Sequence, residues 1–449
     1  MSRYIPVTDA DRQKMLAAIG VKSIDDLFSD IPEKVRVKGL LDIPEGLSEP
    51  EMVRDLKKLT GKNKSAEDLV CFLGAGVYDH FVPAAVDTIV SRGEFTTSYT
   101  PYQPEVAQGT LQAIFEYQTM VCELTGMDVS NASMYDGASA AAEASVIAAA
   151  HTKKDRVLVA RTVSPETRAV LKTYCWSRGF EYAELPDVDG KLCRKSLETE
   201  LAGGKIAALV VQSPNFFGVI EDLNGLAEPI HDAKALLIVS TDLLALGSIE
   251  APGKLGADIV VGDGQSCGNN MSLGGPHFGF MATTQKLMRK MPGRIVGQTE
   301  DIKGRRCFVL TLQAREQHIR REKATSNICS NQNLCTVAAS VYLSLMGPKG
   351  LAEVGHQILA KTAYAVDRLV ATGKFKVAFP KAGCFREVVL ISDEPVEKLN
   401  ARLLKAGILG GYDLKAEYPD LGNGWLLAVT EQRTKEEIDR MVAVAGGEC

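Results

Sequence analysis

The sequence predicts an α/β protein with a mostly parallel, doubly wound sheet. Four apolar runs in the first two thirds of the chain have the length of buried strands: 157–160, 206–211, 236–240 and 259–261. Helical patterns lie before or between these runs: 138–150, 165–178 and 226–235. Continuous apolar strands that alternate with helices are typical of a parallel sheet covered by helices on both faces.

Composition narrows the class of protein. The 449 residues are enough for two or three domains. Lys and Arg total 51 against 56 Asp and Glu, without long single-sign blocks, so we expect neither nucleic acid nor a membrane as a partner. The chain begins without an apolar leader and has no uninterrupted membrane-length run, so we expect a cytoplasmic protein. Ten cysteines without a Cys-x-x-Cys pair predict reduced thiols and no metal site.

The N-terminal part of the chain reads as an arm followed by the start of the large domain. Residues 1–70 are polar and helix-rich, with helix starts predicted at Thr8 and Ser48, each followed by an acidic residue three positions later. A helix is predicted over 106–125 from its apolar spacing. We therefore expect a helical arm over 1–70 and a large α/β domain over 71–330.

The C-terminal part predicts a smaller α+β domain over 331–449. It opens with a helix over 331–346, which leads through a Gly-Pro-Lys-Gly turn into a second helix over 351–371. Three strands and two further helices follow: 375–378, 386–391, 425–429, 395–405 and 434–445.

A possible ligand pocket follows from the order of three elements. Gly137 and Ser139 lie in a turn that opens the alanine-rich helix, in the form of a phosphate cradle. A plain helix start capped by Asp136 is the alternative. Asp242 follows an apolar strand, where α/β sheets collect ligands and where a carboxylate can pair with a pyridinium nitrogen. Taken alone, it is an ordinary strand-end carboxylate.

The spacing of these elements is that of a pyridoxal-phosphate enzyme of the aspartate-aminotransferase-like fold, fold type I. In that fold the next strand should end at the lysine that anchors the cofactor. Ser266 stands there instead, and no lysine occurs between Lys254 and Lys286. A hydroxyl cannot form an imine with the cofactor aldehyde. The sequence therefore predicts a degenerate pocket around Gly137, Ser139, Asp242 and Ser266.

The stretch 96–109 has a composition for binding rather than for core packing. Two prolines stiffen a segment rich in aromatic and polar side chains, of which six are candidates for a binding surface: Ser98, Tyr99, Tyr102, Gln103, Glu105 and Gln108. An incidental surface turn is the alternative. His80, in a titratable trio with Tyr78 and Asp79, is a further candidate, although a structural histidine is the commoner case.

The stretch 315–329 divides into two parts. Its first part could be a solvated helix with an i, i+4 pair between Glu316 and Arg320. The second part, Thr325, Ser326 and Asn327, offers hydroxyl and amide donors in a turn before a new helix.

Several long stretches of the sequence closely resemble the glycine decarboxylase P protein. The resemblance is greatest to its half-length subunit 1 type, which matches the N-terminal half of the single-chain form. These stretches lie at 100–105, 117–120, 131–134, 262–265, 274–279, 312–321 and 325–329, and the resemblance spans nearly the whole chain. One departure is Ala107, where relatives often have serine.

The resemblance implies where the missing amine should be. In that family a second subunit carries the cofactor lysine in an Ala-Asp-x-x-x-x-Asn-x-His-Lys segment. Aligned on Ala257 and Asp258, the pattern places Gln265 at the histidine and Ser266 at the lysine. It thus implies that pyridoxal phosphate is held covalently by the partner subunit, and not by this chain.

The resemblance further implies a shared active site. The assembled complex decarboxylates glycine and passes the aminomethyl group to the lipoyl group of H protein, with two copies of each subunit in a heterotetramer. The candidates in 98–108, together with His80, would form one wall of the site. Thr325, Ser326 and Asn327 would reach across the interface toward the cofactor. Two alternatives stay open: a structural or regulatory pseudoenzyme, and a self-sufficient pyridoxal enzyme whose lysine lies elsewhere.

Overall fold

The computed structural model describes residues 6–447, and the chain divides into two compact units, Met1–Lys64 and Ser65–Cys449. The first five residues of the expected arm and the last two of the expected C-terminal domain lie outside the described residues. The first unit contains helices α1 (Asp9–Ile19) and α2 (Glu49–Thr60). Each begins with the capping box predicted at Thr8 and Ser48, so both helix starts are confirmed.

The second unit is built on a seven-stranded sheet of order β2-β10-β9-β8-β7-β3-β4. Its members are β2 (Val129–Ser130), β3 (Arg156–Ala160), β4 (Glu181–Leu185), β7 (Ile206–Gln212), β8 (Leu236–Ser240), β9 (Ile259–Asp263) and β10 (Gly279–Thr283). The pairs from β4 to β9 are parallel, and β10 runs antiparallel to both β9 and β2. The four predicted strands and the mostly parallel sheet are confirmed.

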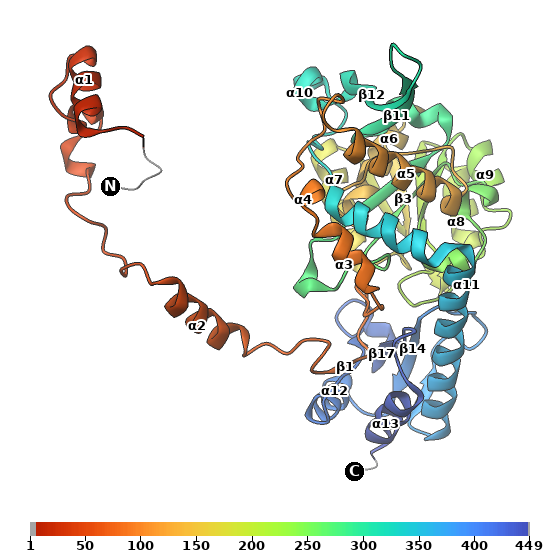
Figure 1. The fold of residues 1–449 in the computed structure, drawn as a ribbon. Coiled ribbons are helices and arrows are strands. Elements are labelled where there is room, and N and C mark those ends of the chain that lie inside the picture. The colour runs from red at the N-terminus through yellow and green to blue at the C-terminus, as the bar shows by residue number, and fades with distance from the viewer. Residues whose placement is uncertain (1–5, 448–449) are drawn as a thin grey trace. The chain divides into compact units, whose positions relative to one another are not determined.

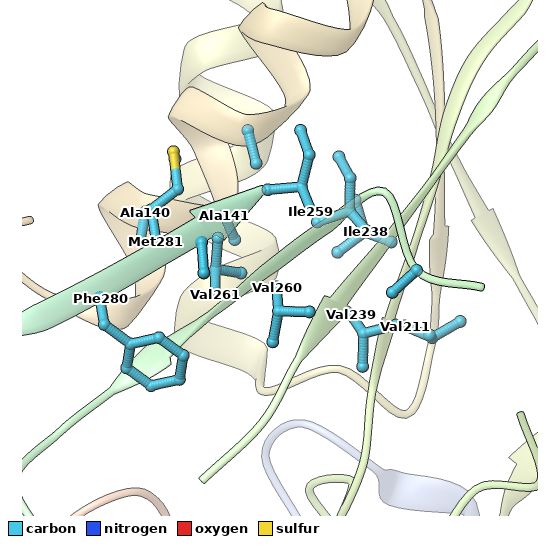
Figure 2. Close-up of a cluster of buried hydrophobic side chains, with 14 of the residues drawn as sticks. Ala140, Ala141, Val211, Ile238, Val239, Ile259, Val260, Val261, Phe280 and Met281 are labelled. Carbon is cyan, nitrogen blue, oxygen red and sulfur yellow. The ribbon is translucent and has the colours of Figure 1, made fainter. Parts of the chain in front are cut away.

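Helices cover the sheet, as the alternation predicted. They are α5 (Gln108–Thr125), α6 (Gly137–Thr152), α7 (Pro165–Arg178), α8 (Arg194–Ala202) and α9 (Ala227–Asp232). Figure 2 shows Ala140 and Ala141 of α6 beside Val261 and Met281 of the sheet, all of them buried. Small side chains on α6 let the helix approach the strands closely. This packing brings the N-terminus of α6 to the carboxyl end of β9, where the Gly137 N–H meets Asp263.

The C-terminal part is an α+β layer, shown in blue in Figure 1. Its antiparallel sheet has the order β13-β14-β17-β16, and β1 pairs with β15 beside it. The strands are β1 (Val70–Cys71), β13 (Phe375–Val377), β14 (Glu387–Ser392), β15 (Ile408–Leu409), β16 (Tyr412–Asp413) and β17 (Gly424–Ala428). Helices α12 (Val396–Lys405) and α13 (Lys435–Gly446) complete the layer, at the predicted places.

Helix α11 (Asn333–Ala371) runs from the large domain into this layer (Figure 1). It is broken at Gly347, whose φ of 56° and ψ of −178° are not helical, so the two predicted helices are confirmed. By length and composition alone α11 could cross a membrane, but half of its apolar window is buried in the protein core. That burial is the pattern of a core helix.

The sequence did not predict the hairpin of β11 (Ile295–Glu300) and β12 (Arg306–Thr311). The hairpin packs on α5. Two short helices, α3 (Ala84–Val90) and α4 (Gly93–Thr96), lead from the first strand to the loop before α5. The segment after the hairpin contains α10 (Gln317–Arg320), a single turn rather than an extended helix.

Candidate active-site pocket and wall

A cavity of about 450 Å³ opens at the carboxyl ends of the central strands. The last residues of β7, β8 and β9, which are Gln212, Ser240 and Asp263, all line it. This edge is where open α/β sheets bind ligands. Gly137, Asp242 and Ser266 also line the cavity, so three of the four residues predicted for the degenerate pocket come together there.

Ser266 and Asp242 contact each other directly. The Ser266 hydroxyl donates to Asp242 Oδ2 at 2.7 Å, and Arg386 Nη1 lies 2.7 Å from the same oxygen. Burial raises the pKa of Asp242, but the nearby Arg386 and His80 and the bond from Ser266 outweigh burial and lower it overall. The carboxylate is therefore ionised, and its counter-ion is a side chain of this chain.

Arg386 belongs to a wider buried network. Its guanidinium lies 3.3 Å from the centre of the Tyr78 ring, and its Nη1 is 3.0 Å from His80 Nε2. His80 Nδ1 in turn lies 2.6 Å from Glu431 Oε2. Glu387 accepts bonds from the Tyr78 hydroxyl and from the Ala75 backbone N–H. The network joins the small C-terminal layer to the strand ends of the large domain.

His80 therefore lies in this network and not on the loop with the other wall candidates. It is buried, with both ring nitrogens engaged. The sequence did not single out Arg386 and Glu387, because both fall inside the run 386–391, which was interpreted only as a strand. The isolated Arg-Glu pair at the start of an apolar strand was the one available signal.

The turn at the start of α6 is already occupied by carboxylates. Asp136 is the N-cap and accepts from the Ser139 backbone N–H at 2.7 Å. The Gly137 N–H donates to Asp263 Oδ2 at 3.3 Å. Burial raises the pKa of Asp263, and the smaller effects of its neighbours do not cancel this rise. The N-cap alternative describes this turn, and Ser139, which does not line the cavity, serves the cap.

The pocket of this chain does not fit pyridoxal phosphate. Of the described residues, none that lines it is a lysine. Asp242, the strand-end carboxylate expected to meet a pyridinium nitrogen, already has Arg386 as its partner. At the corner expected to hold the phosphate, the described residues present the carboxylates Asp136 and Asp263 and neither a lysine nor an arginine. Lys254 is exposed and paired with Glu250, so it does not replace the missing amine.

The loop of wall candidates is largely exposed. The side chain of Tyr99 is 86% exposed and that of Tyr102 is 50% exposed. The Tyr102 hydroxyl accepts from Arg294 Nη2 at 3.2 Å, and its ring meets His318 edge-on, with centroids 6.2 Å apart. Gln103 and Glu105 are also exposed. These four side chains are available to a partner.

Two other wall candidates serve the chain itself. The Gln108 amide donates to the Phe308 carbonyl and accepts from the Phe308 N–H, each at 2.9 Å. It thereby holds the start of α5 against β12. The Ser98 hydroxyl donates to the Phe95 carbonyl at 2.9 Å. Both residues fix the shape of the loop.

The Thr325–Asn327 turn is near the surface. Thr325 and Asn327 are exposed, and the Thr325 carbonyl accepts from Arg178 at 3.0 Å. The Ser326 hydroxyl accepts from the Ile328 N–H at 3.1 Å. The predicted pair of Glu316 with Arg320 is wrong: Glu316 is buried, and its basic neighbour is His318 at 3.5 Å. The short α10 ends before an i, i+4 ladder can form.

Glu143 lies buried in α6 beneath this turn. Burial raises the pKa of its carboxyl to about 7, against the opposing effects of Ser326 and Arg178. One of its oxygens has no hydrogen-bond partner in the part of the chain that the structure describes. The pKa of Glu143 is higher in the folded chain than in the unfolded chain. The free energy of unfolding therefore falls as the pH rises from the unfolded-state pKa to the folded-state pKa, and it stays at the lower level above that.

Replacement of Glu143 by glutamine should remove that cost. We expect the wild-type chain to lose about 2 kcal/mol of unfolding free energy relative to Glu143→Gln between about pH 5.5 and pH 8, because the carboxyl must ionise in the core. Urea denaturation of both proteins at the two pH values measures the difference. A difference that does not change with pH would contradict the prediction.

The family model described as "Glycine cleavage system P-protein" matches residues 2–445. A Bacillus licheniformis protein named "Probable glycine dehydrogenase (decarboxylating) subunit 1" is 55% identical over 444 residues, 99% of this chain and 98% of the relative. A Brevibacillus brevis protein of the same name is 56% identical over 442 residues, 98% of each.

Solved structures are similar to this chain as well. A crystal structure of glycine decarboxylase (P-protein) of the glycine cleavage system, in inhibitor-bound form, superposes with a TM-score of 0.90 and 40% identity over all of both chains. An alanine–glyoxylate aminotransferase from Nostoc has a TM-score of 0.60 at 16% identity, covering 85% of this chain and 95% of its own. A cysteine desulfurase from Thermococcus onnurineus has 0.61 at 14%, covering 90% and 98%. The last two show the fold alone, and the predicted fold type I is confirmed.

Proposed function

Because this chain belongs to the family of glycine cleavage system P-proteins, we propose that it is the non-anchoring subunit of a glycine dehydrogenase (decarboxylating) made of two kinds of chain. The observation that carries the proposal is the pocket that is closed to the cofactor. Ser266 takes the place of the anchoring lysine, and Arg386 neutralises Asp242. The relatives' name, subunit 1, supports a second subunit as the partner.

The lysine-bearing subunit 2 holds pyridoxal phosphate in this proposal. When bound there, the cofactor supplies the electron sink that lets glycine lose CO2 before the aminomethyl group passes to the lipoyl arm of H protein. The present chain contributes the facing wall. Its exposed Tyr99 and Tyr102 cover the reacting centre and exclude water, while Gln103 and Glu105 offer polar contacts.

The turn at 325–327 complements the loop. Thr325, Ser326 and Asn327 provide small donors that can approach the phosphate of a cofactor held by the partner. The Thr325 carbonyl is tied to Arg178, which leaves its hydroxyl free to turn outward. Gln108 and Ser98 keep the neighbouring loop in shape, and His80 acts through the buried network rather than at the wall.

Exposed apolar side chains support the location of the interface. Val106, in the loop, and Ile319, which follows the His318 that meets the Tyr102 ring, are large and exposed. Contiguous exposed apolar surface marks contact sites in proteins. We place subunit 2 on this surface, in a cytoplasmic heterotetramer with two copies of each subunit, which receives H protein as its second protein partner.

Reconstitution tests the function. This chain, a lysine-bearing subunit 2 and lipoylated H protein should together catalyse glycine-dependent exchange of labelled CO2, and either subunit alone should not. If this chain binds subunit 2, but subunit 2 and H protein are equally active without it, the result would support the pseudoenzyme alternative. Exchange by this chain alone would support the self-sufficient enzyme.

A further inference from the structure

Arg294 differs from the other buried arginines of the described chain. Arg294, Arg386 and Arg433 are 3%, 4% and 5% exposed. Arg386 pairs with Asp242 at 2.7 Å and Arg433 with Asp79 at 2.8 Å, whereas Arg294 forms no ion pair among the residues that the structure describes. The Nε atoms of all three arginines have no hydrogen-bond partner among the described residues, so the missing ion pair is what sets Arg294 apart. A buried cation without a counter-ion depends on every acceptor around it.

The acceptors of Arg294 come from two segments that are far apart in sequence. From the loop, the Tyr102 hydroxyl accepts from Nη2 at 3.2 Å, and the Tyr102 ring centre lies 5.4 Å from the guanidinium carbon. From the segment after the turn, the Cys329 carbonyl accepts from Nη2 at 2.7 Å and Asn331 Oδ1 accepts from Nη1 at 3.4 Å. One guanidinium thus bridges both segments.

We propose that Arg294 is the positioning residue that joins the two parts of the active-site wall, the loop with Tyr102 and the segment that follows Thr325–Asn327. The inference rests on the proposed function. The planar guanidinium reaches three acceptors in fixed directions, which a lysine ammonium cannot do from one point. Because no carboxylate among residues 6–447 pairs with it, Arg294 is stable only while both segments stay in contact with it.

Arg168 provides a matched control. Its guanidinium carbon lies 5.4 Å from the centre of the Tyr418 ring, and its Nη2 donates to the Tyr418 hydroxyl at 3.1 Å. These contacts copy those of Arg294 with Tyr102. Arg168, however, pairs with Glu184 at 2.7 Å, and its hydrogen bonds among the described residues go to Val163, Glu184 and Tyr418, none of them in a wall segment. Substitution at Arg168 therefore reproduces the loss of an arginine–tyrosine contact elsewhere in the same chain.

Amide hydrogen exchange on the full-length chain measures whether Arg294 holds the two segments in place, and it does so independently of activity. Arg294→Met should raise amide exchange at least tenfold both in the peptide with Tyr102 and in the peptide spanning 325–331, and Arg294→Lys should have a smaller effect in both. Arg168→Met should leave both peptides as in the wild type. Should Arg294→Met fail to fold, Arg294→Lys and Tyr102→Phe carry the comparison.

Kinetics of the complex with subunit 2 and H protein completes the test. Arg294→Met should lower kcat for CO2 exchange at least tenfold, with the KM for glycine changed less than threefold, and Arg294→Lys should recover part of kcat. Unchanged exchange in either peptide would overturn the bridging role. Faster exchange in both peptides with an unchanged kcat would support the bridge and contradict the proposed wall.

Discussion

Replacement of Arg386 by methionine should lower the free energy of unfolding of this chain by about 3 to 5 kcal/mol, because it leaves a buried carboxylate without its counter-ion. Asp242 is ionised in the pocket, and Arg386 is its only basic partner in the described ion pairs. The substitution also removes the contacts with the Tyr78 ring and His80, which hold the C-terminal layer to the large domain. Urea denaturation measures the loss.

Two controls separate the ion pair from a general effect of arginine loss. Arg305→Met removes a pair with Asp301 at the surface, and it should change stability far less. The double variant Asp242→Leu with Arg386→Met removes both charges and should cost less than Arg386→Met alone. If the single substitution costs no more than the surface control, Asp242 is not held by Arg386.

Alanine at Tyr99, Tyr102 or Thr325 should lower turnover of the assembled complex about tenfold each, a barrier increase of about 1.4 kcal/mol. Tyr99 and Thr325 are exposed, and their replacement removes few contacts inside the chain, whereas Tyr102 also contacts the buried Arg294. The unfolding midpoint of the isolated chain should therefore stay close to that of the wild type for Tyr99→Ala and Thr325→Ala and should fall for Tyr102→Ala. Exchange of labelled CO2 and urea denaturation check the two parts of the prediction.

Leu404→Ala is the matched control for these variants. Leu404 is an exposed apolar residue of α12, in the C-terminal layer and outside the wall segments. Its replacement should leave turnover unchanged. Wild-type turnover in all three wall variants would remove the support for a catalytic contribution by this chain and favour the pseudoenzyme.

Much of the fold could be predicted because its parallel strands are continuous apolar runs. Strands β7 and β8 and helices α6 and α7 lie at or close to the expected bounds. Strand β4 was missed because it lies at the sheet edge and exposes much of its surface, so its sequence has no apolar run. The β11–β12 hairpin was missed because its residues alternate weakly and carry several polar side chains toward solvent.

Only the part of the site that lies at neighbouring strand ends could be predicted from the sequence. Asp242 and Ser266 follow adjacent parallel strands, which is why both could be placed in one pocket, and the structure adds a hydrogen bond between them. Arg386 comes from a different layer more than a hundred residues later, so its approach to Asp242 depends on tertiary packing alone. The same holds for Arg294, whose position just before an unpredicted strand gave no sign of its contacts with Tyr102 and Cys329.

The most direct test of a divided active site is the position of the covalent cofactor in the assembled complex. Borohydride reduction followed by peptide mass spectrometry should find the pyridoxal label on a lysine of the partner subunit and none on this chain. Ser266→Lys should remain unlabelled as well, since Asp242 stays paired with Arg386 and the α6 turn stays filled by carboxylates. A stoichiometric label on any lysine of the wild-type chain would contradict the account.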